Sequence, residues 1–438
     1  MSAAPGFRLA PGGAVAGEIA VPGDKSISHR ALMLGGLARG QTRIHGFLAG
    51  EDCLSTARAL GALGVRIEFD SPTEVRVAGQ GGRGLTAPAG PLDMGNAGTA
   101  MRLMMGLLCG QPFASTLIGD ASLMRRPMER VAVPLRQMGA RIDTQDGRPP
   151  VRIGGGALLQ AIHYALPVAS AQVKSAILLA GLGAQGRTRI TEPAPSRDHT
   201  ERMLAAFGVE LLREGPTLAL EGGQPLHAAD IEVPGDFSSA AFFLVAGCLA
   251  AAQPLTLRNV GVNPTRTGLL EILLRMGADI RVRQHPVKPG AEPVADLEVR
   301  RSALRGITVP EALVPLAIDE FPAFFIAAAC AQGESVVRGA AELRVKESDR
   351  LAAMAEGLTV LGVDNQLLPD GLRLKGTGRP FAGGTIDSRG DHRIAMAFAV
   401  AALRAGAPLL IQDVANVATS FPGFMETARG VGLRIDPA

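Results

Sequence analysis

Apolar and polar positions along this chain predict a regular alternation of helices and strands. Six times an amphipathic stretch runs into a glycine, and a strand-like run follows. Glycine can take the left-handed conformation that ends a helix. The markers lie roughly 70–85 residues apart, the size of a supersecondary unit, and are centred on Gly64, Gly139, Gly208, Gly277, Gly362 and Gly432. They predict six β-α-β-α-β units.

A longer repeat divides these units into two groups of three. The sequence pattern of Ile19–Gly40 is repeated at Ile231–Ala252. In both segments a β-branched run is followed by Val-Pro-Gly-Asp, serine-rich positions and an apolar stretch that predicts a helix. Pro-Gly ends the strand, and Asp can cap the helix. We expect the two strands before Val-Pro-Gly-Asp to lie near the crossovers between the halves. The pattern predicts an α/β (α+β) fold of two lobes, with substrates bound in the cleft between them.

Composition narrows the class of protein. A chain of 438 residues is too long for one core, and 47% hydrophobic with 19% charged residues is typical of packed domains. The net charge of +3 is small, no run of like charge is present, and there is one Tyr and no Trp. These features disfavour nucleic-acid binding and favour a small anionic substrate.

The sequence gives no sign of export, membrane insertion or metal binding. The N-terminal text lacks a basic and then apolar leader, and no apolar run reaches about 18 residues. The longest, Ala240–Gln253, predicts a buried helix. The widely spaced Cys53, Cys109, Cys248 and Cys330 predict buried, reduced thiols in a cytoplasmic protein.

In the first half, polar residues gather where apolar helices begin. Lys25, Ser26 and Arg30 follow a Pro-Gly break, where backbone N–H groups favour an anion. The alternative is an ordinary capped helix. The chain has five lysines against 39 arginines, so a retained Lys suggests a need for its compact ammonium. Asp93–Arg102 is a glycine-punctuated loop in which Gly98 would let a phosphate approach the backbone.

Two further basic or polar loops precede helices. Arg125-Arg126 stands before a helix that we expect Pro127 to begin. Hydroxyl, amide and guanidinium donors that suit a phosphate or polyol follow at Ser170, Gln172 and Arg197. A solvated surface or helix capping is the alternative, and capping is the role expected for Asp198.

The second half supplies acids. Asp319-Glu320 lies between apolar segments, and Glu347 lies among alternating charges. At i, i+4 spacing, Lys346 and Arg350 would share one helix face and point together at an anion. Gly390–Arg393 opens a helix predicted over Ile394–Leu403. We expect Asp319 and Glu347 to handle protons between positive charges that include Arg393.

These motifs together resemble those of the 5-enolpyruvylshikimate-3-phosphate synthase family. The resemblance covers essentially the whole chain, and its wording is most similar to the bacterial class II subgroup. In order, the motifs are VPGDKSISHR, GNAGTAMR, GDASLMRRPM, ASAQVKSAILLAG, SRDHTE, NPTRTG, IDEFP, ELRVKESDR, DHRIAMA and TSFP.

The resemblance implies a two-lobed enolpyruvyl transferase fold of six β-α-β-α-β-β units, three per domain, with the active site in the interdomain cleft. The expected domains are residues 1–23 with 236–438, and residues 24–235.

The resemblance also assigns roles to the polar residues. Those expected to hold 3-phosphoshikimate are Lys25, Ser26, Arg30, Ser170, Gln172, Arg197, Asp319 and Lys346. Those expected to hold phosphoenolpyruvate are Lys25, Gly98, Arg126, Arg350 and Arg393. Asp319 would accept the proton of the 5-hydroxyl, and Glu347, with Lys25, would take part in proton transfer.

The implied reaction is addition and then elimination. Protonation of the enol carbon lets the substrate hydroxyl attack its neighbour, and the tetrahedral adduct then expels phosphate. The product belongs to the shikimate pathway to aromatic amino acids. The resemblance implies no cofactor or metal, no nucleic-acid or membrane partner, and a monomer in the cytoplasm.

Two positions need comment. Many relatives have Lys where this chain has Thr419, so Thr419 receives no site role. Gly98 stands where some herbicide-tolerant relatives carry Ala, which predicts sensitivity to glyphosate.

Two other functions stay open. One is the sister transferase that acts on UDP-N-acetylglucosamine, whose members carry a Cys where this chain has Ala121. The other is a two-lobed anion-binding protein without catalysis, which would not need Asp319 and Glu347.

Overall fold

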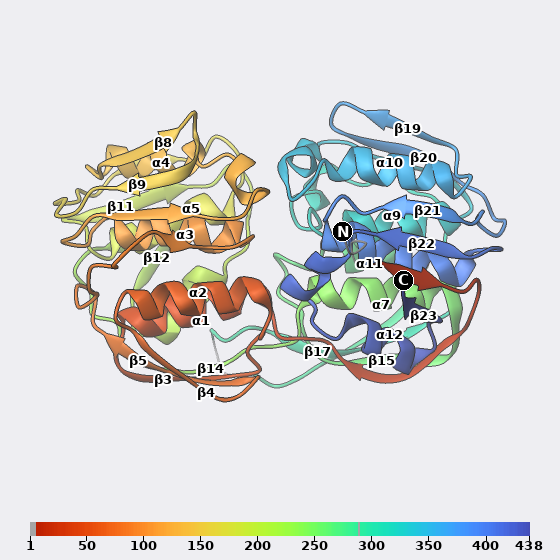
Figure 1. Ribbon diagram of the computed structural model, residues 1–438, viewed down its shortest axis with the longest axis horizontal. Helices are drawn as coiled ribbons and strands as arrows, with labels where there is room; N and C mark the ends of the chain where they lie inside the picture. The colour runs from red at the N-terminus through yellow and green to blue at the C-terminus, as the bar shows by residue number, and fades with distance from the viewer. Residues whose placement is uncertain (1–5, 288–289) are drawn as a thin grey trace. The chain divides into compact units, whose positions relative to one another are not determined.

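The computed structural model describes residues 6–287 and 290–438, which form two compact units (Figure 1). Unit 1 comprises the described chain up to Pro22 together with Pro234–Val287 and Pro293–Ala438. Unit 2 comprises Gly23–Val233 and a short segment that ends at Glu292.

The described part of unit 2 contains three four-stranded sheets, with strand orders β14-β3-β5-β4, β6-β7-β9-β8 and β10-β11-β13-β12. The strands are β3 (Arg39–His45), β4 (Arg66–Ser71), β5 (Glu74–Gln80), β6 (Leu92–Asp93), β7 (Ser115–Ile118), β8 (Ile142–Gln145), β9 (Arg148–Ile153), β10 (His163–Ala165), β11 (Arg187–Thr191), β12 (Leu211–Glu214), β13 (Thr217–Glu221) and β14 (Asp230–Glu232). The helices are α1 (Lys25–Leu37), α2 (Glu51–Ala62), α3 (Gly98–Leu108), α4 (Glu129–Gln137), α5 (Ala171–Gly181) and α6 (His199–Ala206).

The described part of unit 1 has sheets in the orders β16-β17-β15-β2, β18-β20-β19 and β21-β22-β1-β23. The strands are β1 (Phe7–Leu9), β2 (Val15–Ala20), β15 (Ala251–Gly261), β16 (Asp279–Gln284), β17 (Val294–Arg300), β18 (Gly333–Val337), β19 (Asn365–Leu368), β20 (Gly371–Gly376), β21 (Gly384–Asp387), β22 (Leu409–Gln412) and β23 (Ile435–Pro437). The helices are α7 (Phe237–Ala250), α8 (Gly268–Arg275), α9 (Phe321–Cys330), α10 (Arg350–Val360), α11 (His392–Ala401) and α12 (Phe424–Val431).

Six sheets of one pattern confirm the six predicted units. In five of them a parallel pair forms one edge and the other pairs are antiparallel. In the sheet of β18, a parallel bridge from Thr308 to Val336 takes the place of the edge strand. Each of the six marker glycines has a left-handed φ, from +76° at Gly362 to +113° at Gly432, as predicted for residues that end helices.

The two strands that precede Val-Pro-Gly-Asp each pair within their own unit, and the chain passes to the other unit directly after them. β2 leads into α1 of unit 2, yet it pairs in parallel with β15 of unit 1. β14 leads into α7 of unit 1, yet it pairs in parallel with β3 of unit 2. Each Val-Pro-Gly-Asp segment is therefore a crossover, as the repeat predicted.

Each unit has its own apolar core around helices that are buried on nearly every side. In unit 1 these are α7, α9 and α11, and in unit 2 they are α1, α3 and α5. Figure 1 shows the strands β3, β4 and β5 side by side below α1. Full burial of a large apolar side chain contributes roughly 1.5–3 kcal/mol, so these helices hold each unit together.

Two expectations about buried segments need correction. The predicted helix Ala240–Gln253 begins earlier, at Phe237 after the Asp236 cap, and ends at Ala250 because extended Ala251 starts β15. Cys53, Cys109 and Cys248 are buried thiols, but Cys330 is only partly covered, because it is the last residue of α9. No helix in the described part of the chain is long and apolar enough to cross a membrane.

Candidate functional site

In unit 2 the first polar group lies at the start of α1. The Asp24 side chain accepts a hydrogen bond from the Ile27 amide at 2.9 Å, which fixes the helix start at Lys25. The Lys25 ammonium lies 2.9 Å from Asp52 Oδ2 on α2, and its side chain is 17% exposed. This places a lysine at a helix N-terminus, where the helix dipole favours a bound anion.

Arg30 lies one turn further along α1 and is buried. Its Nε donates to Thr200 Oγ1 at 2.6 Å, Nη1 to the Ser26 carbonyl at 2.8 Å, and Nη2 to Ser175 Oγ at 2.9 Å. Burial lowers the pKa of Arg30 to about 10, which still leaves it protonated at neutral pH. Arg30 therefore fixes the backbone of Ser26 and joins α1 to α5 and α6.

The starts of α3 and α5 are joined through Gln172. Its Oε1 accepts from Arg102 Nη1 at 2.7 Å, and its Nε2 donates to Thr99 Oγ1 at 2.9 Å. Ser170 is the N-cap of α5 and accepts from the Val173 amide at 3.4 Å. Two further helix N-termini of unit 2 thus present polar side chains together.

Arg126 borders the start of α3. It donates to the backbone carbonyl of Asn96 at 3.2 Å and to that residue's side chain at 2.5 Å. A Cβ added to Gly98 would lie 3.0 Å from Arg126 Nη1, so the glycine and the guanidinium are neighbours. Pro127 does not begin a helix as predicted, since its carbonyl accepts from Arg102 and α4 begins at Glu129.

A buried ion cluster supports the loop that carries Arg197. Lys174 Nζ lies 3.1 Å from Glu192 and 2.7 Å from Glu201, and none of its side chain is exposed. It also donates to the Ser196 carbonyl at 3.4 Å. Burial raises the pKa of Glu201, although Lys174 opposes that shift.

Asp198, which follows this loop, is the N-cap residue of α6, as expected. Its side chain makes no cap hydrogen bond, however, and accepts from Arg202 Nε at 3.0 Å.

In unit 1 two cations meet at Asp319, just before α9. Its Oδ1 lies 3.4 Å from Lys346 Nζ and 3.3 Å from Arg350 Nη1. The predicted i, i+4 helix face is wrong, because Lys346 follows the 3₁₀ helix Ala341–Val345 and Arg350 begins α10. Both cations nevertheless converge, on a carboxylate rather than along a helix.

Arg350 is enclosed by acids. Nε donates to Asp391 Oδ2 at 2.8 Å and Nη2 to Glu347 Oε2 at 2.5 Å, and only 1% of the side chain is exposed. Burial opposes the Arg350 cation, but Asp391, Glu347 and Asp319 outweigh it and raise its pKa. The guanidinium is therefore a permanent positive charge that orders both Asp319 and Glu347.

Arg393 lies at the start of α11, which begins at His392, close to the prediction. Its backbone N–H donates to Asp391 Oδ1, the helix cap, at 2.9 Å. Its Nη1 donates to the Asp319 carbonyl at 3.0 Å and lies 4.0 Å from Glu320 Oε1. The structure thus brings Asp319, Lys346, Arg350 and Arg393 together, with Glu347 beside Arg350.

Sequence reasoning missed the residues that pair with these groups. Asn96 and Arg102 lie within Asp93–Arg102, and Asp391 lies within Gly390–Arg393, the segments that the sequence analysis singled out. They could have been predicted as partners, because a buried charge needs one. Asp52 carried no usable signal, and Glu320 was singled out with Asp319 but its partners were not predictable, because these contacts depend on the tertiary fold. Thr419, which received no role, donates to the Asn416 carbonyl at 2.7 Å. Among the described residues, no group of three or more His, Cys, Asp or Glu is placed to hold a metal ion.

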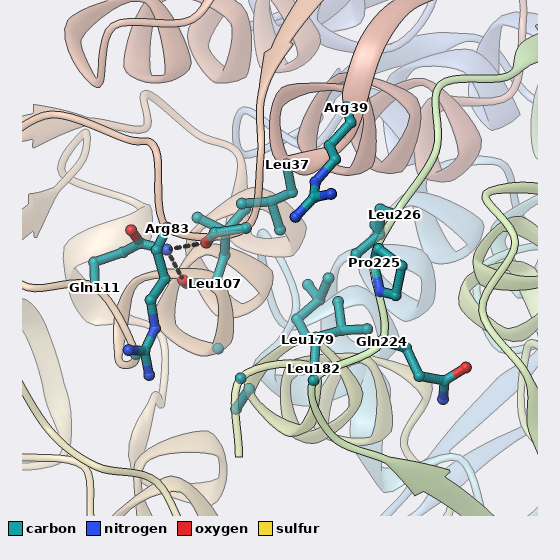
Figure 2. Close-up of a pocket in the computed structure, with 16 residues that line it drawn as sticks. Leu37, Arg39, Arg83, Leu107, Gln111, Leu179, Leu182, Gln224, Pro225 and Leu226 are labelled. Carbon is teal, nitrogen blue, oxygen red and sulfur yellow. Dashed lines mark hydrogen bonds between the residues drawn. The ribbon is translucent and has the colours of Figure 1, made fainter. Parts of the chain in front are cut away.

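A pocket of about 380 Å³ in unit 2 lies at the opposite ends of the three core helices. It is lined by Leu37, Leu107 and Leu179, near where α1, α3 and α5 end. Figure 2 shows Gln111 at this pocket, where its Nε2 donates to two backbone carbonyls at 3.0 and 3.5 Å. None of the predicted site residues lines it, and the cations at this pocket are Arg39 and Arg83.

The two clusters have complementary chemistry. In unit 2, cations and three helix N-termini suit phosphate groups. In unit 1, carboxylates held between cations suit a proton transfer beside a bound anion.

The chain is similar to known proteins over nearly its whole length. Residues 9–428 match the family model described as EPSP synthase (3-phosphoshikimate 1-carboxyvinyltransferase). The 3-phosphoshikimate 1-carboxyvinyltransferase of Methylococcus capsulatus is 59% identical over 431 residues, 98% of each chain. That of Halorhodospira halophila is 60% identical over 432 residues, 98% of this chain and 97% of the relative. A solved EPSP synthase from Acinetobacter baumannii superimposes with a TM-score of 0.88 at 52% identity, covering 99% of this chain and 100% of that one.

Proposed function

Because the chain belongs to the EPSP synthase (3-phosphoshikimate 1-carboxyvinyltransferase) family, we propose that its two clusters serve one reaction. The enzyme transfers the enolpyruvyl group of phosphoenolpyruvate to the 5-hydroxyl of 3-phosphoshikimate and releases phosphate, in the shikimate pathway to aromatic amino acids. The observation that carries the proposal is the Asp319 carboxylate, held 3.4 Å from Lys346 and 3.3 Å from Arg350.

The unit 2 cluster holds 3-phosphoshikimate in this proposal. Lys25, Ser26 and Arg197 bind the substrate directly, and Ser170 and Gln172 add hydroxyl and amide groups. Arg30 is also assigned to this substrate, and its hydrogen bond to the Ser26 carbonyl supports a role in ordering the start of α1.

Phosphoenolpyruvate takes groups from both clusters in this proposal. Arg126 binds its phosphate beside Gly98, where a side chain would crowd the guanidinium. Arg350 and Arg393 bind its carboxylate, with the fixed fork geometry that arginine offers to a carboxylate. Lys25 contacts both substrates.

The unit 1 carboxylates move the protons. Asp319 accepts the proton of the 5-hydroxyl while Lys346 steadies the substrate beside it. Glu347, with Lys25, takes part in the transfer of a proton to the methylene carbon, which makes the neighbouring carbon electrophilic. The hydroxyl attacks that carbon, and its proton passes to Asp319. The tetrahedral adduct then breaks its bond to phosphate and returns one methyl proton to Glu347, with Lys25, which restores the carbon–carbon double bond as the enol ether. Both substrates are small molecules, and we expect the chain to act on them as a cytoplasmic monomer without nucleic-acid or membrane partners.

Phosphate release tests the proposed function. Phosphoenolpyruvate should yield phosphate with 3-phosphoshikimate, and mass spectrometry should show the enol ether product. UDP-N-acetylglucosamine, the acceptor of the sister transferases, should yield none. Two results would contradict the proposal. One is phosphate release with UDP-N-acetylglucosamine but not with 3-phosphoshikimate, and the other is binding of 3-phosphoshikimate with no turnover of either acceptor.

Gly98 predicts sensitivity to glyphosate. A Cβ at this position would lie 3.0 Å from Arg126 Nη1 and 3.4 Å from Arg102 Nη1, so Gly98→Ala should displace a phosphate-binding cation. We expect wild type to be inhibited competitively with phosphoenolpyruvate. Gly98→Ala should raise the inhibition constant about tenfold or more, and KM for phosphoenolpyruvate should rise less. Inhibition constants at varied phosphoenolpyruvate check this, and tolerance of the wild type at low phosphoenolpyruvate would contradict it.

A further inference from the structure

Glu320 is a fully buried carboxylate for which the proposed mechanism has no use. It follows Asp319 directly, and none of its side chain is exposed. A buried carboxylate is costly unless cations and hydrogen-bond donors surround it. The nearest cations are Arg266 Nη2 at 3.9 Å and Arg393 Nη1 at 4.0 Å, both measured to Glu320 Oε1.

A directional chain of hydrogen bonds fixes this oxygen. Arg266 Nη2 donates to Asp236 Oδ1 at 2.9 Å and to Ser238 Oγ at 2.7 Å. Because the Ser238 oxygen accepts from Arg266, its own hydrogen is left for Glu320 Oε1, to which it donates. Asp236, Ser238 and Arg266 are each at least nine-tenths buried, so water does not loosen the chain.

The chain of hydrogen bonds ends at Glu320, and Arg393 lies at ion-pair distance beyond it. One nitrogen, Nη1, is held between the Asp319 carbonyl at 3.0 Å and Glu320 Oε1 at 4.0 Å. A guanidinium recognises a carboxylate through a planar fork, so the orientation of that plane decides how well the pair forms.

We propose that Glu320 is a positioning residue, which orients Arg393 for the carboxylate of phosphoenolpyruvate through the chain from Arg266 and Ser238. This inference rests on the function proposed above. It also gives the second Val-Pro-Gly-Asp copy a task, because that copy supplies Asp236 and Ser238. The second copy supports a substrate-binding arginine, whereas the first contributes Lys25 itself.

The test is a steady-state comparison of wild type with Glu320→Gln. Gln keeps the volume and an oxygen that can accept from Ser238, but it removes the charge beside Arg393. We expect KM for phosphoenolpyruvate to rise about tenfold and KM for 3-phosphoshikimate to stay within about twofold. Glu320→Asp keeps the charge on a shorter side chain. Its KM for phosphoenolpyruvate should lie between the values of wild type and Glu320→Gln.

Asp296→Asn is the matched control. Asp296 is a carboxylate in β17 of the same unit that accepts from Arg258 Nη1 at 2.6 Å. Its loss should leave both KM values unchanged.

Two outcomes would overturn the proposal. One is an unchanged KM for phosphoenolpyruvate in Glu320→Gln. The other is a fall in kcat and Tm alone, which marks a purely structural carboxylate. If Glu320→Gln does not fold, Ser238→Ala decides, since it keeps the Glu320 charge and removes the hydroxyl that accepts from Arg266 and donates to Glu320. It should raise the same KM about threefold, and no change contradicts the inference. Wild type without turnover would instead contradict the proposed function.

Discussion

His29 is a titratable side chain near Lys25 and Arg30, the two cations proposed to bind substrate, but it is kept neutral. It is fully buried in α1, and its Nδ1 lies 2.8 Å from Thr56 Oγ1. Burial, with Lys25 and Arg30 nearby, lowers the pKa of His29 from 6.5 to about 3. The site therefore gains no extra positive charge from this histidine at physiological pH.

His29 should make the stability of the protein fall in mild acid. In the unfolded chain it binds a proton below pH 6.5, whereas the folded chain resists protonation down to about pH 3. The contribution of His29 to the free energy of unfolding is therefore full above about pH 6.5 and falls as the pH drops. The loss should be about 1.4 kcal/mol between about pH 7.5 and 5.5.

Urea unfolding of wild type and His29→Gln at both pH values measures this loss. The variant should be less stable at the higher pH but should depend less on pH. His163→Gln, at an exposed position of β10, serves as the control and should keep the pH dependence of wild type. Parallel pH dependences for wild type and His29→Gln would contradict the assigned pKa.

At the scale of elements, α3 and α5 touch backbone to backbone. A Cβ on Gly106 of α3 would lie 2.1 Å from the Ala176 carbonyl of α5. The helices can be this close only because Gly106 has no side chain. Their closeness brings Gln172 within hydrogen-bond distance of Thr99 and Arg102 at the helix starts.

Gly106→Ala should therefore separate the two helices. We expect a loss of about 1–3 kcal/mol in the free energy of unfolding and a higher KM for 3-phosphoshikimate, because Gln172 moves. Gly61→Ala in α2, where a Cβ meets nothing within 4 Å, should instead stabilise by roughly 0.5–1 kcal/mol. Urea unfolding and steady-state kinetics check both variants. If the two substitutions changed the free energy of unfolding equally, the close approach of α3 and α5 would not be what requires glycine at position 106.

Element boundaries show where sequence reasoning works and where it stops. The glycines that end helices were predictable, because the left-handed conformation is a local property of one residue. The shared helix face of Lys346 and Arg350 was wrong because the i, i+4 rule assumes an unbroken helix. Asp349 between them caps a new helix by accepting from the Ala352 amide, and that local signal was overlooked. The pairs of Lys25 with Asp52 and of Ser238 with Glu320 had no local signal, since the chain distance between partners is long.

At the scale of the whole molecule, two separate cores lie in units that the chain joins at the two Val-Pro-Gly-Asp crossovers. We propose that these units are the two domains of the fold, with three repeats each. Unit 2 depends on its own buried charges, of which Lys174 with Glu192 and Glu201 is the clearest case. An unpaired buried carboxylate is strongly destabilising. Because each unit has its own core, we expect the loss of stability to stay largely within unit 2.

Lys174→Met tests that independence. Removing the ammonium leaves Glu192 and Glu201 without their buried counter-charge, and we expect a loss of about 3–5 kcal/mol. Hydrogen exchange should speed up for the amides of α5, while those of α9 in unit 1 keep their wild-type rates. Equal acceleration in both helices would contradict independent cores and would indicate one cooperative unit.

The central claim is that the cations of unit 2 bind the phosphorylated substrate while a carboxylate of unit 1 handles its proton. Asp319→Asn tests it most directly, through binding of 3-phosphoshikimate by calorimetry and phosphate release on the same preparation. The substitution removes the proton acceptor and leaves Lys25 and Arg30 in place. We predict a Kd within about threefold of wild type and a turnover at least about 100-fold lower. Unchanged turnover, or a loss of affinity that matches the loss of turnover, would contradict this division of roles.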